Sequence, residues 1–147
     1  MNKKQNILSK GQPINGKYKV TFFLKKGDYA ETYRVKDREG KTKLLKLFYY
    51  SKLDRTQFDD NHDILEIEIL KNIKHPNLVS FCDSGELLLD SQKYAFVILD
   101  FISGETIADK MKREQSFNPY DAKDVISGVL NGLNYLHNLK RPVIHND

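Results

Sequence analysis

Lys46 and Glu66 are charged residues in apolar surroundings, which makes them the first candidates for chemistry. Lys46 alternates with Leu44 and Phe48 in a strand-like run, so it shares their face, where an unpaired ammonium is costly to bury. Glu66 lies 20 residues later, in a helix-like run with isoleucine and leucine on both sides. A helix packed over the sheet would place Glu66 against Lys46 and hold the ammonium in position for a phosphate group. The alternatives are an edge lysine that extends to water and a solvated glutamate.

The segment LKKGDYAETYRV, residues 24–35, supplies a turn that lets the main chain approach a ligand closely. Gly27 and Ala30 are small, and glycine adopts turn conformations that other residues avoid. By itself such a turn is more typical of an ordinary β-hairpin. Its significance therefore depends on the features that accompany it.

The elements that must position these residues form an α+β pattern. Apolar alternation and turn residues predict five strands, at residues 17–24, 31–35, 42–50, 77–90 and 93–101. In the first strand one face is expected to carry Tyr18, Val20, Phe22 and Leu24. Helical spacing predicts one helix at residues 64–73 and two more at 105–114 and from Pro119 onward, the last capped by Asn118. This order predicts a five-stranded antiparallel sheet with one inserted helix, followed by a helical region.

The composition indicates one domain in a reducing compartment. The chain has 147 residues, 39% of them apolar, and 24 basic against 20 acidic residues give a net charge of +4 that is spread along the sequence. Nucleic-acid binding would rest only on this charge and on aromatic residues that core burial explains more simply. Cys82 is the single cysteine, so no internal disulfide forms. Without an apolar signal segment or a run of ~18 apolar residues, a cytoplasmic protein with no membrane partner is expected.

Taken in order, these features resemble the first part of a protein kinase domain of the Ser/Thr-like superfamily. The V-A-I-K segment of that family matches KLLK, which ends at Lys46, and its helix glutamate matches Glu66, nine residues before an HPN turn at 75–77. The strand and hinge match FVILDFISGETI, and the helix leading to H-R-D matches LNGLNYLHNLKRPVIHND. The glycine-loop pattern G-x-G-x-x-G-x-V lies over Lys25, Gly27, Ala30 and Thr32. The resemblance covers residues 17–147.

The resemblance implies ATP as cofactor and phosphoryl transfer to Ser/Thr hydroxyls of a protein substrate. Lys46, held by Glu66, would contact the α- and β-phosphates, and Asp147 would accept the proton of the substrate hydroxyl. The nucleotide would also be bound by Leu24, Gly27, Ala30, Thr32, Leu44, Leu99, Asp100 and Ile102. Of these, Asp100 and Ile102 would use their main chain on the purine edge. The implied organisation is a flexible leader at 1–16, an N-terminal lobe at 17–101, a hinge at 102–104 and the start of a helical lobe at 105–147.

The sequence departs from the family pattern at several positions. Lys25 replaces the first loop glycine, Ala30 the third, Thr32 the valine and Asn146 the arginine of H-R-D. The Mg²⁺ ligands of the family would follow Asp147, so none is assigned here. We therefore expect a piece of a longer kinase that is inactive alone and whose last helices pack against the rest of that lobe. The alternatives are a pseudokinase-like nucleotide-binding or scaffold module and a small-molecule kinase that shares the fold.

Overall fold

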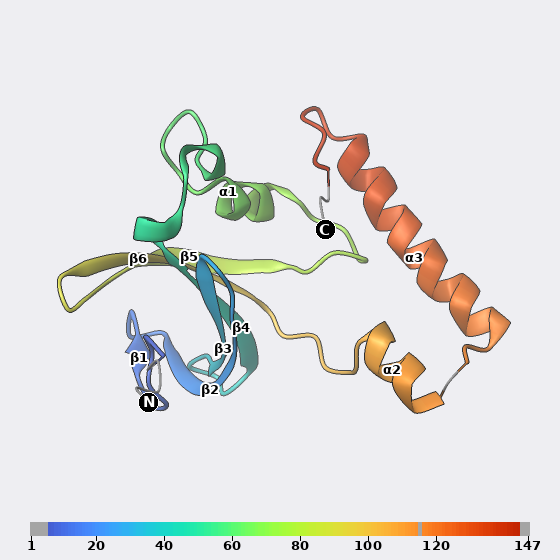
Figure 1. Cartoon of the computed structure of the whole chain (residues 1–147), viewed down its shortest axis with the longest axis horizontal. Helices are drawn as coiled ribbons and strands as arrows, with labels where there is room; N and C mark the ends of the chain where they lie inside the picture. Colours follow the sequence, from blue (N-terminus) through green and yellow to red (C-terminus); the bar gives the residue numbers. More distant parts are fainter. Residues whose placement is uncertain (1–5, 115, 145–147) are drawn as a thin grey trace. The chain divides into compact units, whose positions relative to one another are not determined.

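The computed structural model describes residues 6–114 and 116–144. It divides into two compact units (Figure 1), one formed by Met1–Asn72 with Ser80–Phe101 and the other by Ile73–Val79 with Ile102–Asp147. No helix within the described part of the chain is long and apolar enough to cross a membrane.

The first unit is an antiparallel sheet with one α-helix, in agreement with the predicted α+β class. Its strands are β1 (Pro13–Ile14), β2 (Tyr18–Lys26), β3 (Ala30–Lys36), β4 (Thr42–Tyr49), β5 (Phe81–Leu89) and β6 (Gln92–Asp100). They are arranged in the order β1-β2-β3-β4-β6-β5, so within the described residues the sheet has six strands rather than the predicted five. Two short 3₁₀ turns, Tyr50–Lys52 and Arg55–Gln57, precede the helix α1 (Leu65–Asn72).

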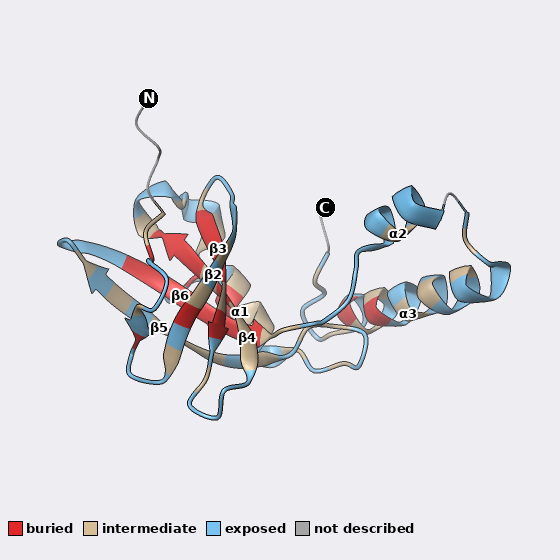
Figure 2. Cartoon of the chain, turned by 90° about the horizontal axis from the view of Figure 1, so that it is seen from below, coloured by how far each residue is buried: buried red, intermediate tan, exposed pale blue. Residues whose placement is uncertain are grey.

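Strand register gives the sheet two different faces. Tyr33 pairs with Leu45, which pairs with Ile98, and directly paired residues of antiparallel strands point to the same side. This side, the core face, carries the main apolar cluster, and Figure 2 shows how much of the central strands is buried. The opposite side, the site face, carries Lys46, because successive residues of a strand alternate in direction.

Residues 6–16 are packed onto the sheet, which corrects the prediction of a flexible leader for this part of the chain. Leu8 and Ile14 belong to the buried core cluster, and Ile14 pairs with Tyr18 in β2. The main-chain N–H of Leu8 donates to the hydroxyl of Tyr33 at 3.0 Å. Leu8 and Ile14 anchor the segment, but they are isolated among polar residues, so the sequence showed no apolar pattern that predicts this packing.

Two β-bulges in β2 correct the predicted alternation of that strand. Register shifts lie between Val20 and Phe22 and between Phe23 and Lys25. As a result Phe23, not Phe22, packs against Tyr33 in the core, with ring centroids 5.6 Å apart. Phe22 is 55% exposed. Each bulge adds a residue to one strand and so reverses the faces beyond it, which strict alternation cannot anticipate.

The second unit contains α2 (Ile107–Glu114), α3 (Pro119–His137) and the loop at residues 73–79. The predicted cap of α3 is present, since the side chain of Asn118 accepts from the N–H of Tyr120 at 2.9 Å. The loop packs closely on α3: a Cβ at Gly132 would lie 3.4 Å from Leu78 Cδ2. The hydroxyl of Tyr135 accepts from the N–H of Lys74 at 3.0 Å. The helix residues Ile126, Val129 and Leu130 are exposed.

The buried carboxylate of Glu31 should make the folded chain measurably less stable in acid. Its carboxylate is buried on the core face, and although burial raises its pKa, hydrogen bonds from Lys26, Tyr33 and Tyr49 outweigh this and hold the pKa below its ordinary value of 4.5. The unfolded chain therefore takes up a proton at this residue before the folded chain does, so stability is lost as the pH falls below about 4.5. The midpoint temperature of thermal unfolding, measured from pH 7 down to pH 3, should fall less steeply in Glu31→Gln than in the unchanged chain. Equal slopes would contradict the prediction.

Candidate functional site

Lys46 and Glu66 form a close ion pair. The ammonium Nζ of Lys46 lies 2.6 Å from Oε1 and 2.7 Å from Oε2 of Glu66. The two side chains are 24% and 37% exposed, so the pair stands at a surface and not in the core. The predicted contact between strand and helix is confirmed, and the alternative of two separate solvated charges is wrong.

Two aromatic rings complete the surroundings of the ammonium. Lys46 Nζ lies 5.0 Å from the ring centre of Phe48 and 5.2 Å from that of Tyr29. At these distances the ring faces attract a cation. The sequence indicated Phe48 through its alternation with Lys46. Tyr29 was missed, because its ring reaches the site from the turn between β2 and β3.

Local structure explains why the lysine and the glutamate meet. Lys46 stands between Thr32 and Val97 across three central strands, which fixes its main chain. In α1, Ile67 is buried next to Glu66 and anchors the helix. The partner of the other helix glutamate, Glu68, is Lys71 at 2.5 Å within the same helix. Glu66 thus remains available for the sheet.

The site face also brings together five of the nine residues predicted to bind nucleotide. In register, Thr32 pairs with Lys46 and Leu44 with Leu99, while Ala30 pairs with Phe48. Because Leu44, Lys46 and Phe48 alternate along β4, all three pairs lie on one face. Ala30, Thr32, Leu44, Lys46 and Leu99 therefore share one face of the sheet. Their roles toward a ligand remain predictions.

The turn after β2 is closed by a hydrogen bond from the N–H of Gly27 to the carbonyl of Ala30, at 2.8 Å. Gly27 is not among the residues with positive φ, and a Cβ there would lie 3.5 Å from the Ala30 oxygen, an ordinary contact. The fold of the turn therefore does not require glycine at this position. Leu24, in the second bulge of β2, is partly exposed, and its neighbour Lys25 pairs with Thr32.

Asp100, the last residue of β6, is held firmly by its side chain and its main chain. Its N–H donates to the carbonyl of Ser80 at 2.9 Å. Its Oδ1 lies 2.7 Å from Lys43 Nζ and 3.3 Å from Cys82 Sγ. The hydrogen bond with Asp100 raises the pKa of Lys43 to about 12. Burial and then the bond to Asp100 raise the pKa of the Cys82 thiol. The side chain of Asp100 is thus engaged in structure.

Of the remaining predicted residues, Ile102 belongs to the second unit. Ile102 is described and is 74% exposed. Asp147 lies outside the described residues, as does Asn146. Gly104 has a φ of +138°, which is strained for any residue with a side chain, so glycine is required at that point of the connector.

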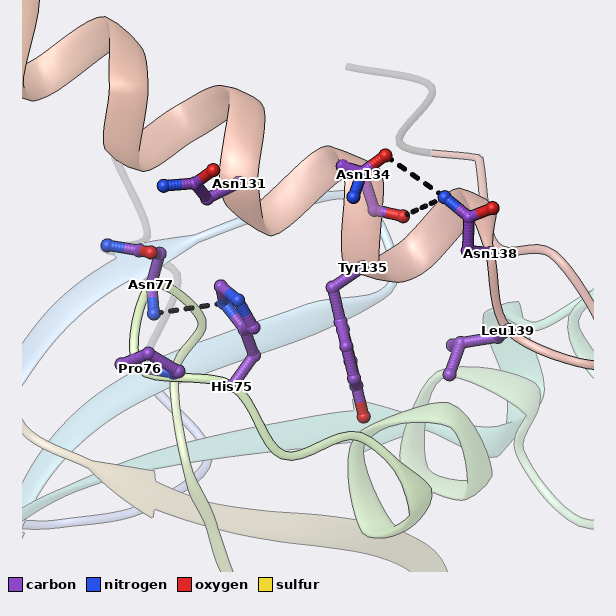
Figure 3. A pocket seen from close by; sticks show the side chains of 8 residues that line it. All are labelled: His75, Pro76, Asn77, Asn131, Asn134, Tyr135, Asn138 and Leu139. Atoms are coloured by element: carbon purple, nitrogen blue, oxygen red, sulfur yellow. Dashed lines mark hydrogen bonds between the residues drawn. The ribbon is translucent and has the colours of Figure 1, made fainter.

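A hollow in the second unit was not expected from the sequence. It has a volume of about 540 Å³ and lies between α3 and the loop at 73–79 (Figure 3). Half of its lining residues are asparagines, and the full lining consists of His75, Pro76, Asn77, Asn131, Asn134, Tyr135, Asn138 and Leu139. The ring of His75 stacks on Tyr135 with centroids 5.0 Å apart. Among the predicted site residues that the structure describes, none lines this hollow.

Comparisons with known proteins agree with this geometry. The family model described as "Protein kinase domain" matches residues 18–147. A probable serine/threonine-protein kinase, fhkD, from Dictyostelium discoideum is 30% identical over an alignment of 142 residues, which covers 92% of this chain and 18% of that protein. The serine/threonine-protein kinase tousled-like 2 of Mus musculus is 27% identical over 138 residues, 91% of this chain and 19% of that protein.

A bacterial relative is similar to the same extent. The probable serine/threonine-protein kinase PknB of Bifidobacterium longum is 28% identical over 144 residues, 90% of this chain and 20% of that protein. The chain thus spans about a fifth of the length of these relatives. With the family model matching most of its residues, the chain belongs to the protein kinase family.

Proposed function

We propose that this chain is the ATP-binding part of a protein kinase domain, which in the full domain transfers a phosphoryl group from ATP to Ser/Thr hydroxyls of a protein substrate. The observation that carries the proposal is the Lys46–Glu66 pair, with Nζ to Oε distances of 2.6 and 2.7 Å, on the same sheet face as Thr32 and Leu44. Cation and apolar surface side by side are what a nucleotide requires, since its phosphates are anionic and its base is flat.

The Lys46–Glu66 pair is suited to positioning a nucleotide phosphate and not to forming or breaking covalent bonds. Phosphoryl transfer is catalysed mainly by alignment and by stabilisation of charge on the phosphate oxygens. Glu66 holds the ammonium of Lys46 at a fixed place, and a phosphate would reach it from the open side of the pair. Gly27, whose turn does not need a glycine, would let the main chain of the turn approach the phosphates. Asp147 remains our proposal for the residue that accepts the hydroxyl proton.

Members of this family generally use Mg²⁺ with ATP, and the metal would screen the phosphate charge. Residues 6–114 and 116–144 contain no group of three or more His, Cys, Asp or Glu side chains that could hold a metal ion. The described residues therefore do not form a magnesium site by themselves. No magnesium-dependent step is assigned to them.

A nucleotide-binding or scaffold module without catalysis is the second candidate. Lys25 and Ala30 occupy two glycine positions of the loop pattern, which favours a loop with altered phosphate contacts. We propose a cytoplasmic location for either candidate.

ATP should stabilise the chain against unfolding. A ligand that binds only the native state adds about 2.7 kcal/mol at a concentration of 100 times its Kd. Thermal unfolding with ATP, ADP and GTP, each with and without Mg²⁺, measures this gain, and inorganic triphosphate separates base from phosphate binding. We expect a larger shift with ATP than with triphosphate. The absence of a shift with any nucleotide would reject the proposed function.

A further inference from the structure

Glu31 is the centre of a hydrogen-bond cluster on the core face, away from the proposed nucleotide contacts. Its side chain is 0% exposed. Its carboxylate accepts from the main-chain N–H of Ile7 at 2.9 Å, the hydroxyl of Tyr49 at 2.6 Å, the ammonium of Lys26 and the hydroxyl of Tyr33. A buried carboxylate is tolerated only when its oxygens are well supplied with donors. Each of the four donors therefore affects how firmly Glu31 is held.

The donors come from three separate parts of the chain. These are the N-terminal segment with Ile7, the β2–β3 hairpin with Lys26 and Tyr33, and the end of β4 with Tyr49. Lys26 is the last residue of β2 and Glu31 the second residue of β3, so their contact closes the β2–β3 hairpin just outside its turn. Ile7 is 24 residues away in sequence, and the next residue, Leu8, donates its N–H to Tyr33 of the same cluster. The cluster thus ties the segment at residues 6–8 to both strands of the hairpin.

The position of Glu31 connects the two faces of the sheet. Its chain neighbours Ala30 and Thr32 lie on the site face, paired with Phe48 and Lys46. Because the three residues are covalently consecutive, a shift of Glu31 on one face moves Ala30 and Thr32 on the other. The hairpin is therefore held over Lys46 from the side that a nucleotide would not touch.

Packing on the core cluster and the hydrogen bonds of Ile7 and Leu8 together attach the segment at residues 6–8. Leu8 is buried, but a hollow of about 290 Å³ lies between residues 6–10 and 20–23 of β2. Packing is therefore incomplete along this stretch. The hydrogen bonds from Ile7 and Leu8 supply the specific fixation.

We propose that Glu31 is a positioning residue through which residues 6–8, the strap, hold the β2–β3 hairpin in its nucleotide-binding position; this rests on the proposed function. Removing the strap takes one donor from Glu31 and frees the hydroxyl of Tyr33 from Leu8. The hairpin then loosens, and nucleotide affinity falls although no residue of the site face has changed. A molecule that displaces the strap from the sheet would therefore lower the affinity of the site for nucleotide.

The substitution Ile7→Pro tests the strap because proline lacks the N–H that Glu31 accepts. Lys10→Pro is the matched control. Gln12 N–H donates to the Ser9 carbonyl at 3.1 Å and Gly11 has a φ of +89°, so Lys10 occupies the turn position that proline prefers. Lys26→Met removes a donor to Glu31 at the hairpin end of the same cluster. It tests the role of Glu31 in holding the hairpin even if Ile7→Pro does not fold.

Two measurements decide the outcome. Without nucleotide, hydrogen exchange at the amides of Gly27 and Tyr49, which bond to Ala30 and Tyr29 of the turn, should quicken about tenfold in Ile7→Pro and Lys26→Met. The Kd for ATP should rise about tenfold, with Lys10→Pro unchanged in both.

The proposal is overturned if exchange quickens equally throughout β4 and β6, which indicates general destabilisation. It is also overturned if the hairpin amides are unaffected, or if they exchange faster while ATP affinity is retained. Failure of the unchanged chain to bind ATP rejects the proposed function instead. The exchange measurement still decides whether the strap holds the hairpin.

Discussion

Lys46→Met should abolish at least about half of the stabilisation that ATP confers. The substitution keeps the length and apolar character of the side chain but removes the ammonium that Glu66 holds at 2.6 and 2.7 Å. Hydrogen bonds to charged groups contribute about 1.5–3 kcal/mol, so the Kd for ATP should rise by about 10- to 100-fold. At a concentration that gave about 2.7 kcal/mol of stabilisation, roughly 1.4 to 0.4 kcal/mol would remain.

The matched control is Lys93→Met. Lys93 and Glu86 form another lysine–glutamate pair of the same sheet, at 2.7 Å, but both side chains are more than half exposed. Partly exposed pairs contribute at most about 1 kcal/mol, so neither substitution should unfold the chain without ligand. Lys93→Met should keep the full response to ATP. An undiminished response in Lys46→Met would show that the nucleotide, if it binds, does so away from the ion pair.

The contact of Lys46 with Glu66 was predictable because each residue carried a local signal. A lysine that alternates with Leu44 and Phe48, and a glutamate beside the buried Ile67, both face the layer between strand and helix. Periodicity fixes the direction of a side chain, and two opposite charges directed into the same layer attract each other. The ring of Tyr29 beside Lys46 lacked such a signal, since turn residues have no periodic direction.

Other features depend on tertiary structure that alternation does not encode. The bulges of β2 reversed the faces of Phe22 and Phe23, and β1 formed from two residues, Pro13 and Ile14. Glu31 did carry a sign of its role, because it shares the period of Tyr33 and Val35 and thus the buried face. A charged residue in that register requires donors. The donors were unpredictable, since one of them belongs to the N-terminal segment.

Phe96→Ala should cause the largest loss of stability. Phe96 is 2% exposed, lies in the middle of β6 and pairs with Leu47 in the core. Truncating a buried phenylalanine costs about 3–5 kcal/mol, which is a large part of the stability of a small domain. Phe22→Ala is the control, because that ring is 55% exposed and its loss should cost under about 1 kcal/mol. Urea unfolding compares them, and similar midpoints would contradict the burial of Phe96.

The packing of Phe96 on Gly85 makes a sharper test of the same core. A Cβ at Gly85 would lie 2.9 Å from Cζ and 3.0 Å from Cε1 of the Phe96 ring, closer than side chains approach one another. Gly85→Ala should therefore cost about 1–3 kcal/mol through overpacking. In the Phe96→Ala background the ring is gone, so the same substitution should cost much less, and the two effects should not add. Additive effects would mean that the ring does not cover Gly85, and the register between β5 and β6 would then have to be revised.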